Sequence, residues 1–99
     1  MRMIRKMFSS TNKGFAITFE NGWTASVQWG PGNYCDNRYK DELGFIPKEP
    51  VTSTNAEIAA WDSKGVWHRF ESDDVKGYCK PAEVLWFLNM IANKEKQND

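Results

Sequence analysis

The chain has 99 residues, enough for one small domain with a single hydrophobic core and little stability to spare. Its 13 basic and 13 acidic residues cancel, which argues against a dedicated binder of duplex nucleic acid or of a membrane surface, because phosphate contacts need a basic excess. No apolar run approaches the ~18 residues that cross a bilayer, and Arg2, Arg5 and Lys6 interrupt the region where a signal peptide would be apolar. The composition predicts one globular domain over residues 1–99, located in the cytoplasm, with both cysteines reduced.

Alternating apolar residues predict two strands, one on each side of residues 20–22, after a basic lead-in over residues 1–13 that could add a further strand. A two-residue turn between them would place the apolar residues of the two strands on opposite faces of the sheet. A three-residue turn instead pairs Phe19 with Trp23 and brings all the apolar residues to one face. Gly22 then takes the left-handed conformation at a bulge.

The same reasoning predicts a second hairpin, with strands over residues 56–61 and 66–70. A turn over residues 63–65, again with glycine at its third position, would continue the pairing as far as Ile58 and Phe70.

The other face of this hairpin carries Trp61 directly across from Trp67, with Arg69 nearby. A cross-strand aromatic pair contributes roughly 0.5–1.5 kcal/mol beyond its buried area. Left uncovered, the three side chains would form an aromatic platform of the kind that anchors protein partners.

A helix is predicted from Pro81 to Ala92, since proline suits the first helical position and Glu83 the first turn. Its apolar stripe, expected to lie across the sheet, comprises Val84, Leu85, Phe87, Leu88 and Ile91. Residues 93–99 form a polar tail. The predicted fold is α+β, an antiparallel sheet of about four strands with a C-terminal helix on one face.

The loop over residues 30–38 combines glycines, a proline, amides and an aromatic residue, a mixture that packing alone does not require. It lacks the ending of a phosphate loop, but glycine lets a backbone approach a ligand closely. Its polar side chains could bind a nucleobase, ribose or phosphate while an aromatic ring stacks on the base, which contributes about 1–3 kcal/mol. The alternative is a surface turn whose Asn and Asp residues bond their own backbone. The candidate ligand-binding residues are Trp29, Gly30, Gly32, Asn33, Tyr34, Asp36 and Arg38.

The sequence gives only weak evidence for a metal site or for a catalytic nucleophile. Cys35, Asp36, His68 and Cys79 lack the paired spacing of a zinc site, so we expect no metal and no other cofactor. Nothing in the sequence indicates a lowered thiol pKa or a base beside Cys35, and a buried, inert cysteine is the favoured interpretation.

The run FENGWTASVQWGPGNYCDNR, residues 19–38, resembles the motif F-x-N-G-W-T-x-S-V-Q-W/F-G-P-x-N-Y-C of an uncharacterised family of small proteins encoded by tailed bacteriophages. Residues 74–78 and 81–84 look like the end of those proteins. The resemblance covers about half of the chain and brings no catalytic residues with it. It implies a non-structural protein made in the cytoplasm of an infected bacterium.

These observations favour a non-enzymatic phage accessory protein that binds a small nucleotide-like molecule, such as a host defence signal, through residues 30–38. A homo-oligomer with pockets between chains would suit such sequestration. The alternative is an inhibitor or adaptor that binds a host protein through Trp61, Trp67 and Arg69. An enzyme that uses Cys35 or a carboxylate, and a structural part of the virion, are further alternatives.

Overall fold

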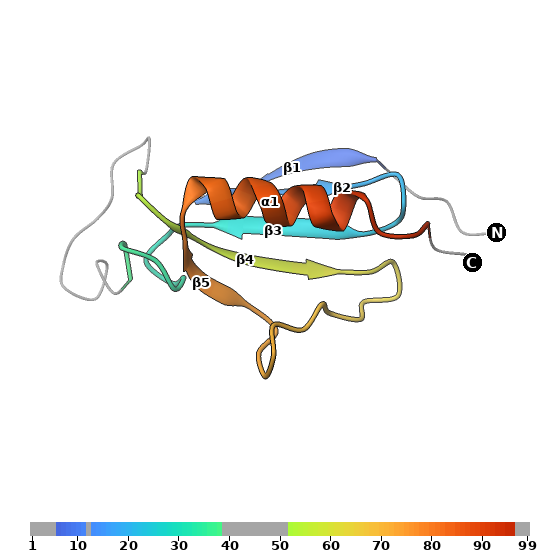
Figure 1. Cartoon of the computed structure of the whole chain (residues 1–99). Coiled ribbons are helices and arrows are strands. Elements are labelled where there is room, and N and C mark those ends of the chain that lie inside the picture. The colour runs from blue at the N-terminus through green and yellow to red at the C-terminus, as the bar shows by residue number, and fades with distance from the viewer. Residues whose placement is uncertain (1–5, 12, 39–51, 97–99) are drawn as a thin grey trace.

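The computed structural model describes residues 6–11, 13–38 and 52–96 as an antiparallel sheet with one helix packed on it (Figure 1). The elements are β1 (Met7–Thr11), β2 (Gly14–Thr18), β3 (Thr24–Gln28), β4 (Ala56–Trp61), β5 (Lys76–Cys79) and α1 (Pro81–Ala92), and the strands lie in chain order across the sheet. The predicted α+β fold is confirmed, with five strands instead of about four. Residues 1–5 of the basic lead-in and 97–99 of the polar tail lie outside the described residues.

The β2–β3 hairpin has the predicted register. Phe15 lies opposite Val27 and Ile17 opposite Ala25, and the Phe19 amide donates to the Trp23 carbonyl oxygen at 2.8 Å. Gly22 closes the three-residue turn with a φ of 94°, a conformation that glycine adopts without strain. The apolar residues of both strands therefore share one face of the sheet.

The second hairpin has the predicted pairing near its turn, but the pairing does not extend to Phe70. The amide of Asp62 donates to Val66 and that of His68 to Ala60, both at 2.9 Å, and Trp61 lies across from Trp67. The predicted strand over residues 66–70 and the pairing of Ile58 with its last residue are nevertheless wrong, because Ile58 pairs with Lys76 of β5.

A tight turn at Phe70 ends the second hairpin. Phe70 and Asp73 exchange backbone hydrogen bonds of 2.7 and 2.9 Å, and Glu71 between them has a φ of 54°. The Arg69 guanidinium fixes this turn by donating to the Asp74 carboxylate at 2.6 Å and to the Ser72 carbonyl oxygen at 2.7 Å. The chain therefore turns back before residues 66–70 form a full strand. The edge strand beside β4 is β5 instead.

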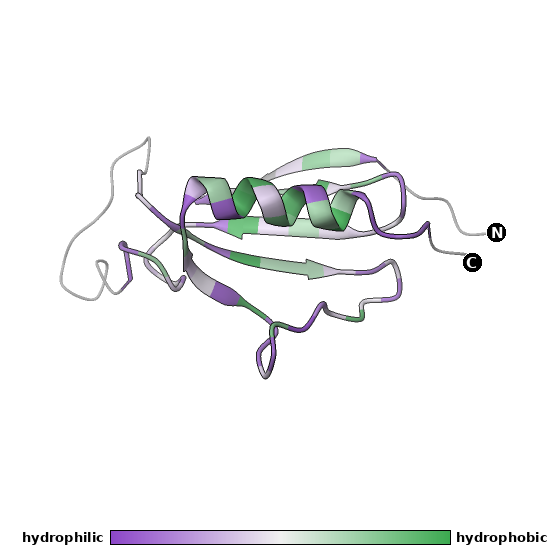
Figure 2. Cartoon of the chain, viewed as in Figure 1, coloured by the Kyte–Doolittle hydropathy of each residue, from purple (hydrophilic) through white to green (hydrophobic). Residues whose placement is uncertain are grey.

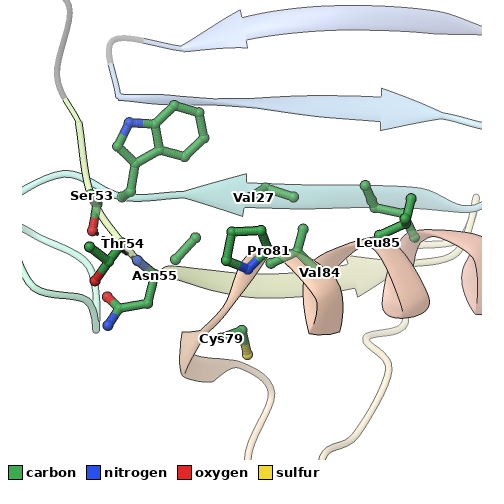
Figure 3. A pocket seen from close by; sticks show the side chains of 11 residues that line it. Val27, Ser53, Thr54, Asn55, Cys79, Pro81, Val84 and Leu85 are labelled. Atoms are coloured by element: carbon green, nitrogen blue, oxygen red, sulfur yellow. Dashed lines mark hydrogen bonds between the residues drawn. The ribbon is translucent and has the colours of Figure 1, made fainter.

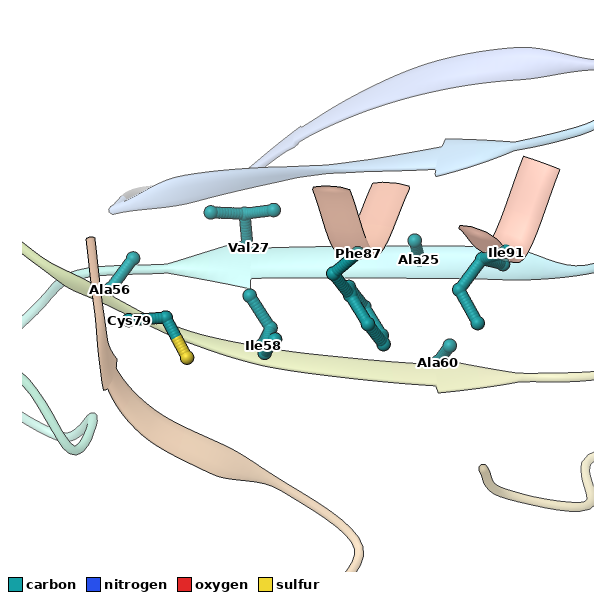
Figure 4. Close-up of a cluster of buried hydrophobic side chains, with 8 residues drawn as sticks. All are labelled: Ala25, Val27, Ala56, Ile58, Ala60, Cys79, Phe87 and Ile91. Atoms are coloured by element: carbon teal, nitrogen blue, oxygen red, sulfur yellow. The ribbon is translucent and has the colours of Figure 1, made fainter. Parts of the chain in front are cut away.

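The core lies between α1 and the middle of the sheet, where the helix contacts β3 and β4. It contains Ala25, Val27, Ala56, Ile58, Ala60, Cys79, Phe87 and Ile91 (Figure 4). Apolar residues continue along β3, β4 and α1, whereas the connecting loops are mostly hydrophilic (Figure 2). Leu85 was predicted to join the core stripe but is exposed. It precedes Phe87 by two residues, about 200° around the helix, and so points almost the opposite way.

Asn21, in the β2–β3 turn, holds the C-terminal end of α1. Its buried side-chain amide donates to the carbonyl oxygens of Ile91 at 2.8 Å, Lys94 at 3.1 Å and Ala92 at 3.3 Å. Its side-chain oxygen accepts from the Trp23 amide at 3.0 Å. The last carbonyl groups of a helix have no partner within the helix. Asn21 supplies a donor to those of Ile91 and Ala92, while the Asn93 amide donates to Asn89 and Met90, so Asn21 completes the end of the helix and fixes it to the hairpin.

Candidate functional site

The loop over residues 30–38 is anchored to the sheet by Glu57 of β4. The Glu57 carboxylate accepts hydrogen bonds from the Asn33 side-chain amide at 3.2 Å and from the Tyr34 backbone amide at 3.0 Å. The Asn33 side-chain oxygen in turn accepts from the Gly30 amide at 2.9 Å. Hydrogen bonds to a charged acceptor are stronger than neutral ones, so the first half of the loop is firmly held.

The second half of the loop is joined to the segment that leads into β4. The Asp36 carboxylate accepts from the Thr54 hydroxyl at 2.5 Å and from the Asn55 side-chain amide at 3.0 Å, and the Asp36 amide donates to the Asn55 side-chain oxygen at 2.8 Å. Asn37 is buried and donates to the carbonyl oxygens of Trp29 at 2.7 Å and Thr52 at 2.9 Å. The polar groups of Asn33 and Asp36, predicted to contact a ligand, therefore hold the loop in shape.

Beyond these anchoring contacts, the loop presents the exposed side chain of Tyr34, with the half-buried Arg38 beside it. The Tyr34 ring is 46% exposed, and the Arg38 guanidinium carbon lies 4.1 Å from the ring centroid. Arg38 also donates to the Gly32 carbonyl oxygen at 3.0 Å. A guanidinium over an aromatic ring is an attractive arrangement, and it fixes a positive charge beside an exposed aromatic surface.

Tyr34 is joined to β5 through a close backbone contact. The Tyr78 amide donates to the Tyr34 carbonyl oxygen at 2.8 Å, and a Cβ atom on Gly77 would lie only 2.4 Å from the Tyr34 Cβ. Only glycine fits at that position. Tyr78 itself has a φ of 56°, a conformation that costs a non-glycine residue roughly 1–3 kcal/mol and that clusters at functional sites.

A hollow of about 310 Å³ lies between these two segments. It is lined by Tyr34, Asp73, Val75, Gly77 and Tyr78, and we call it the tyrosine hollow. Its two tyrosines are 46% and 54% exposed, and Asp73 supplies a carboxylate. Only Tyr34 among these five residues was predicted from the sequence. The other four come from β5 and the segment before it. The adjacent Gly77 and Tyr78 are the one feature of the sequence that could have indicated a site there.

The other predicted ligand residues are not gathered at the tyrosine hollow. Gly32 is exposed, with no atom within 4 Å of a Cβ placed there, whereas Gly30 is buried against the Lys13 side chain. The Trp29 ring lies edge-on to Phe15, with centroids 6.2 Å apart. Trp29 instead lines a different, mostly apolar groove of about 320 Å³ beside α1.

That second groove, which we call the apolar groove, runs between β3 and one side of α1 (Figure 3). Val27 and Trp29 form one wall, and Val84, Leu85 and Leu88 of α1 form the other. Residues 53–55 close one end.

The Trp61–Trp67 pair is formed as predicted. The ring centroids are 5.0 Å apart and the planes are inclined by 37°, while Trp67 and the neighbouring Val66 are exposed. The Arg69 guanidinium, predicted to lie beside them, instead donates to the Asp74 carboxylate and stabilises the turn at Phe70.

The titratable groups near the core are poorly suited to nucleophilic catalysis. Both cysteines are buried, and burial, followed by the charge of Glu83, raises the pKa of Cys79 to about 11. The thiolate is the reactive form, so this thiol stays protonated at neutral pH. Burial, followed by the charge of Lys94, lowers the pKa of His68. The His68 ring packs edge-on against Phe70 and Phe87, with centroids 4.9 and 5.8 Å away.

Comparisons of the chain with protein-family models, with curated proteins and with solved structures find no match. Over residues 6–11, 13–38 and 52–96, no cluster of three or more His, Cys, Asp or Glu side chains is placed to hold a metal ion. In the same part of the chain, no helix has the length and apolar character needed to cross a membrane.

Proposed function

We propose that this protein is a non-enzymatic binding protein that holds a planar, anionic, nucleotide-like molecule in the tyrosine hollow. The observation that carries the proposal is the pair of exposed tyrosines, Tyr34 and Tyr78, which line the hollow and are joined by a backbone hydrogen bond of 2.8 Å. Stacking a base on an aromatic ring contributes about 1–3 kcal/mol. Because the backbones of both tyrosines are already held by hydrogen bonds, little backbone entropy is lost when a ligand binds.

Each group near the hollow has a defined role in this proposal. The tyrosine rings contact the faces of the base, and Arg38, stacked on Tyr34, attracts the negative charge of a phosphate. The Asp73 carboxylate accepts hydrogen bonds from amino or hydroxyl groups of the ligand. The volume of about 310 Å³ is at the lower end of the ~300–1,000 Å³ of small-molecule sites, which suits one nucleoside unit.

Binding without turnover agrees with the chemistry of the described residues. The Cys79 thiol is held protonated by its raised pKa, and Cys35 is buried with its thiol directed at the Gly30 carbonyl oxygen at 3.4 Å. The resemblance to phage proteins sets the proposed context, the cytoplasm of an infected bacterium, where the bound molecule would be withdrawn from a host defence pathway.

Thermal unfolding across a panel of mono-, di- and cyclic nucleotides tests the proposal. A ligand at 100 times its dissociation constant should stabilise the native state by about 2.7 kcal/mol. We expect Tyr34→Ala and Tyr78→Ala to abolish that gain and Trp67→Ala, a matched exposed aromatic, to keep it. An unchanged melting temperature with every nucleotide, or conversion of the ligand to a product, would contradict the proposal.

A second candidate function is favoured by the stacked Trp61–Trp67 pair with exposed Val66 beside it. Rigid aromatic side chains of this kind are frequent anchors of protein interfaces. In this case Trp67→Ala should abolish capture of a host protein from lysate, and Tyr34→Ala should leave it unchanged. The opposite pattern would exclude this surface.

A further inference from the structure

Helix α1 is unusual for a surface helix because it carries almost no charge. Glu83 is the only charged residue in its 12 positions. Its outward side presents Leu85, 70% exposed, and Trp86, 65% exposed, together with Ala82 and Asn89. A surface helix normally has charged and polar residues opposite its apolar stripe, and a helix that is apolar on all sides is normally buried. The outward side of α1 is therefore suited to contact another protein surface.

The half of the sheet beside α1 has the complementary feature. The helix packs on β3 and β4, and no described element packs over β1 and β2 on this side. The register places Phe8 next to Ile17, and Ile17 next to the core residue Ala25, so all three point to the helix side. Phe8 is 82% exposed. We call the surface over β1 and β2 on this side the strand valley.

The strand valley has the dimensions of one helix. Two strands spaced ~4.8 Å apart span about 10 Å, and an α-helix with its side chains is about 10 Å across. The apolar groove lies between the valley and α1, with Val27 on its sheet side and Leu85 on its helix side (Figure 3). Phe15 of β2 packs edge-on against Trp29, which lines the groove, and so joins the groove to the valley. One continuous apolar surface therefore consists of a helical ridge and a valley of equal width, side by side.

We propose that a second copy of this chain covers this surface, with α1 of each copy lying in the strand valley of the other. A ridge beside a valley of matching width is self-complementary about a two-fold axis parallel to the strands, which is the geometry of an isologous dimer. The product is a layer of two helices enclosed between two five-stranded sheets.

A second copy explains both features of the surface, whereas a foreign helix in the valley explains only one. A foreign helix would cover Phe8 and leave the outward side of α1 exposed. A second copy covers the valley and the uncharged side of α1 together. The paired surface measures about 18 Å, the length of the 12-residue helix, by about 20 Å for two helix widths, a footprint of about 360 Å². It is therefore smaller than the ~800 Å² that each partner buries in a standard interface, and we expect a weak dimer.

This inference is independent of the proposed ligand function. The tyrosine hollow is built on the loop that Glu57 anchors, and Glu57 alternates along β4 with the core residue Ile58, so it faces the other side of the sheet. A dimer through α1 therefore leaves the hollow accessible.

Sedimentation equilibrium of the full chain tests the proposal. We expect a dimer for the wild-type protein, and we expect Leu85→Lys and Phe8→Lys each to raise the dimer dissociation constant at least tenfold, because each places a charge in the interface. Both residues are exposed, so circular dichroism should show an unchanged fold. Ser9→Lys is the matched control, since Ser9 is an exposed neighbour on β1 that points to the opposite face, and it should leave the dimer intact.

A mixture of Leu85→Glu with Phe8→Lys tests which elements meet. If α1 lies in the valley of the partner, opposite charges face one another in the mixed dimer, and native mass spectrometry of an equimolar mixture should show heterodimer well above the proportion that random pairing gives. A monomeric wild-type protein at millimolar concentration would overturn the proposal. So would a dimer that neither lysine variant weakens, or a mixture whose heterodimer does not exceed the proportion from random pairing.

Discussion

On the side beneath α1, β3 and β4 present Ala25, Val27 and Ile58, which form a closed core. On the opposite side the same two strands present Ser26, Gln28 and Glu57, which form hydrogen bonds instead. Because successive side chains of a strand point to opposite faces, the two faces of this sheet have different roles. The helix side supplies the packing energy, and the polar side supplies a charged anchor that holds the loop over residues 30–38 in one conformation.

The exposed apolar residues also differ between the two sides of the sheet. On the polar side, aromatic residues at Tyr34 and Trp67 stand on segments whose backbones are hydrogen-bonded to neighbours. On the helix side, Phe8 and Leu85 stand exposed beside a groove. We therefore assign small-molecule binding to the polar side and association between copies to the helix side.

Truncating one aromatic residue on each side tests the assignment most strongly. Phe87→Ala should lower the free energy of unfolding by about 3–5 kcal/mol, because its ring is buried in the core and its removal leaves a cavity. Tyr34→Ala should lower it by less than about 1 kcal/mol, because the ring is half exposed. Urea unfolding followed by circular dichroism measures both. Similar losses would contradict a core confined to the helix side.

Removing the Asn21 side chain should have the next largest effect. Asn21→Ala removes the side-chain donor to the Ile91 and Ala92 carbonyl oxygens and should cost roughly 1–3 kcal/mol of unfolding free energy. Asn21→Asp keeps the acceptor for Trp23 but puts a negative charge at the negative end of the helix dipole. It should be at least as destabilising as the alanine variant in urea unfolding. A milder effect of Asp would mean that the cap acts through Trp23 and not through the helix.

Weakening the loop anchor should affect function more than stability. Glu57→Gln replaces one acceptor oxygen by an amide donor and should cost about 1 kcal/mol, while loosening Tyr34 and weakening nucleotide binding. Glu20→Gln is the matched control, because Glu20 is exposed and only pairs with Lys6 at 3.5 Å, and it should change stability by less than about 0.5 kcal/mol. Titration calorimetry and urea unfolding report the two effects. Full affinity in Glu57→Gln would exclude a role for the anchor.

Acidification should produce the smallest effect, through His68. Its pKa is lowered in the folded protein from the ordinary value of 6.5, first by burial and then by the charge of Lys94. Below about pH 6.5 the unfolded chain therefore binds more protons than the folded one, and stability falls as pH falls until the folded group is also protonated. The urea midpoint of the wild type should drop more between pH 8 and pH 5.5 than that of His68→Gln. Parallel drops in the two proteins would assign the pH dependence to other groups.

Local patterns were sufficient to predict much of the fold. The alternation on both sides of Gly22 decided the register of the β2–β3 hairpin, because only one turn length puts the apolar residues on one face. Pro81 and the apolar spacing after it set the bounds of α1. Both features depend on neighbours in sequence.

The features that the sequence did not reveal depend on specific side-chain contacts, which the alternation of apolar residues does not encode. The turn at Phe70 is fixed by Arg69 and Asp74, and nothing in local alternation excludes a longer strand there. In the candidate site, Asn33 and Asp36 were recognised as special, but their partners Glu57 and Asn55 lie about twenty residues away. An amide in a loop has the same local signature whether it binds a ligand or holds the loop.

Native mass spectrometry of the protein purified from its host cells tests the central claim most directly, namely that the tyrosine hollow binds a nucleotide-like molecule. We predict that the wild-type protein retains an added mass of nucleotide size, and that Tyr78→Ala loses it while Trp67→Ala keeps it. A wild-type protein without added mass that also gains none from the nucleotide panel would contradict the claim. A mass retained equally by Tyr78→Ala would contradict its placement in the hollow.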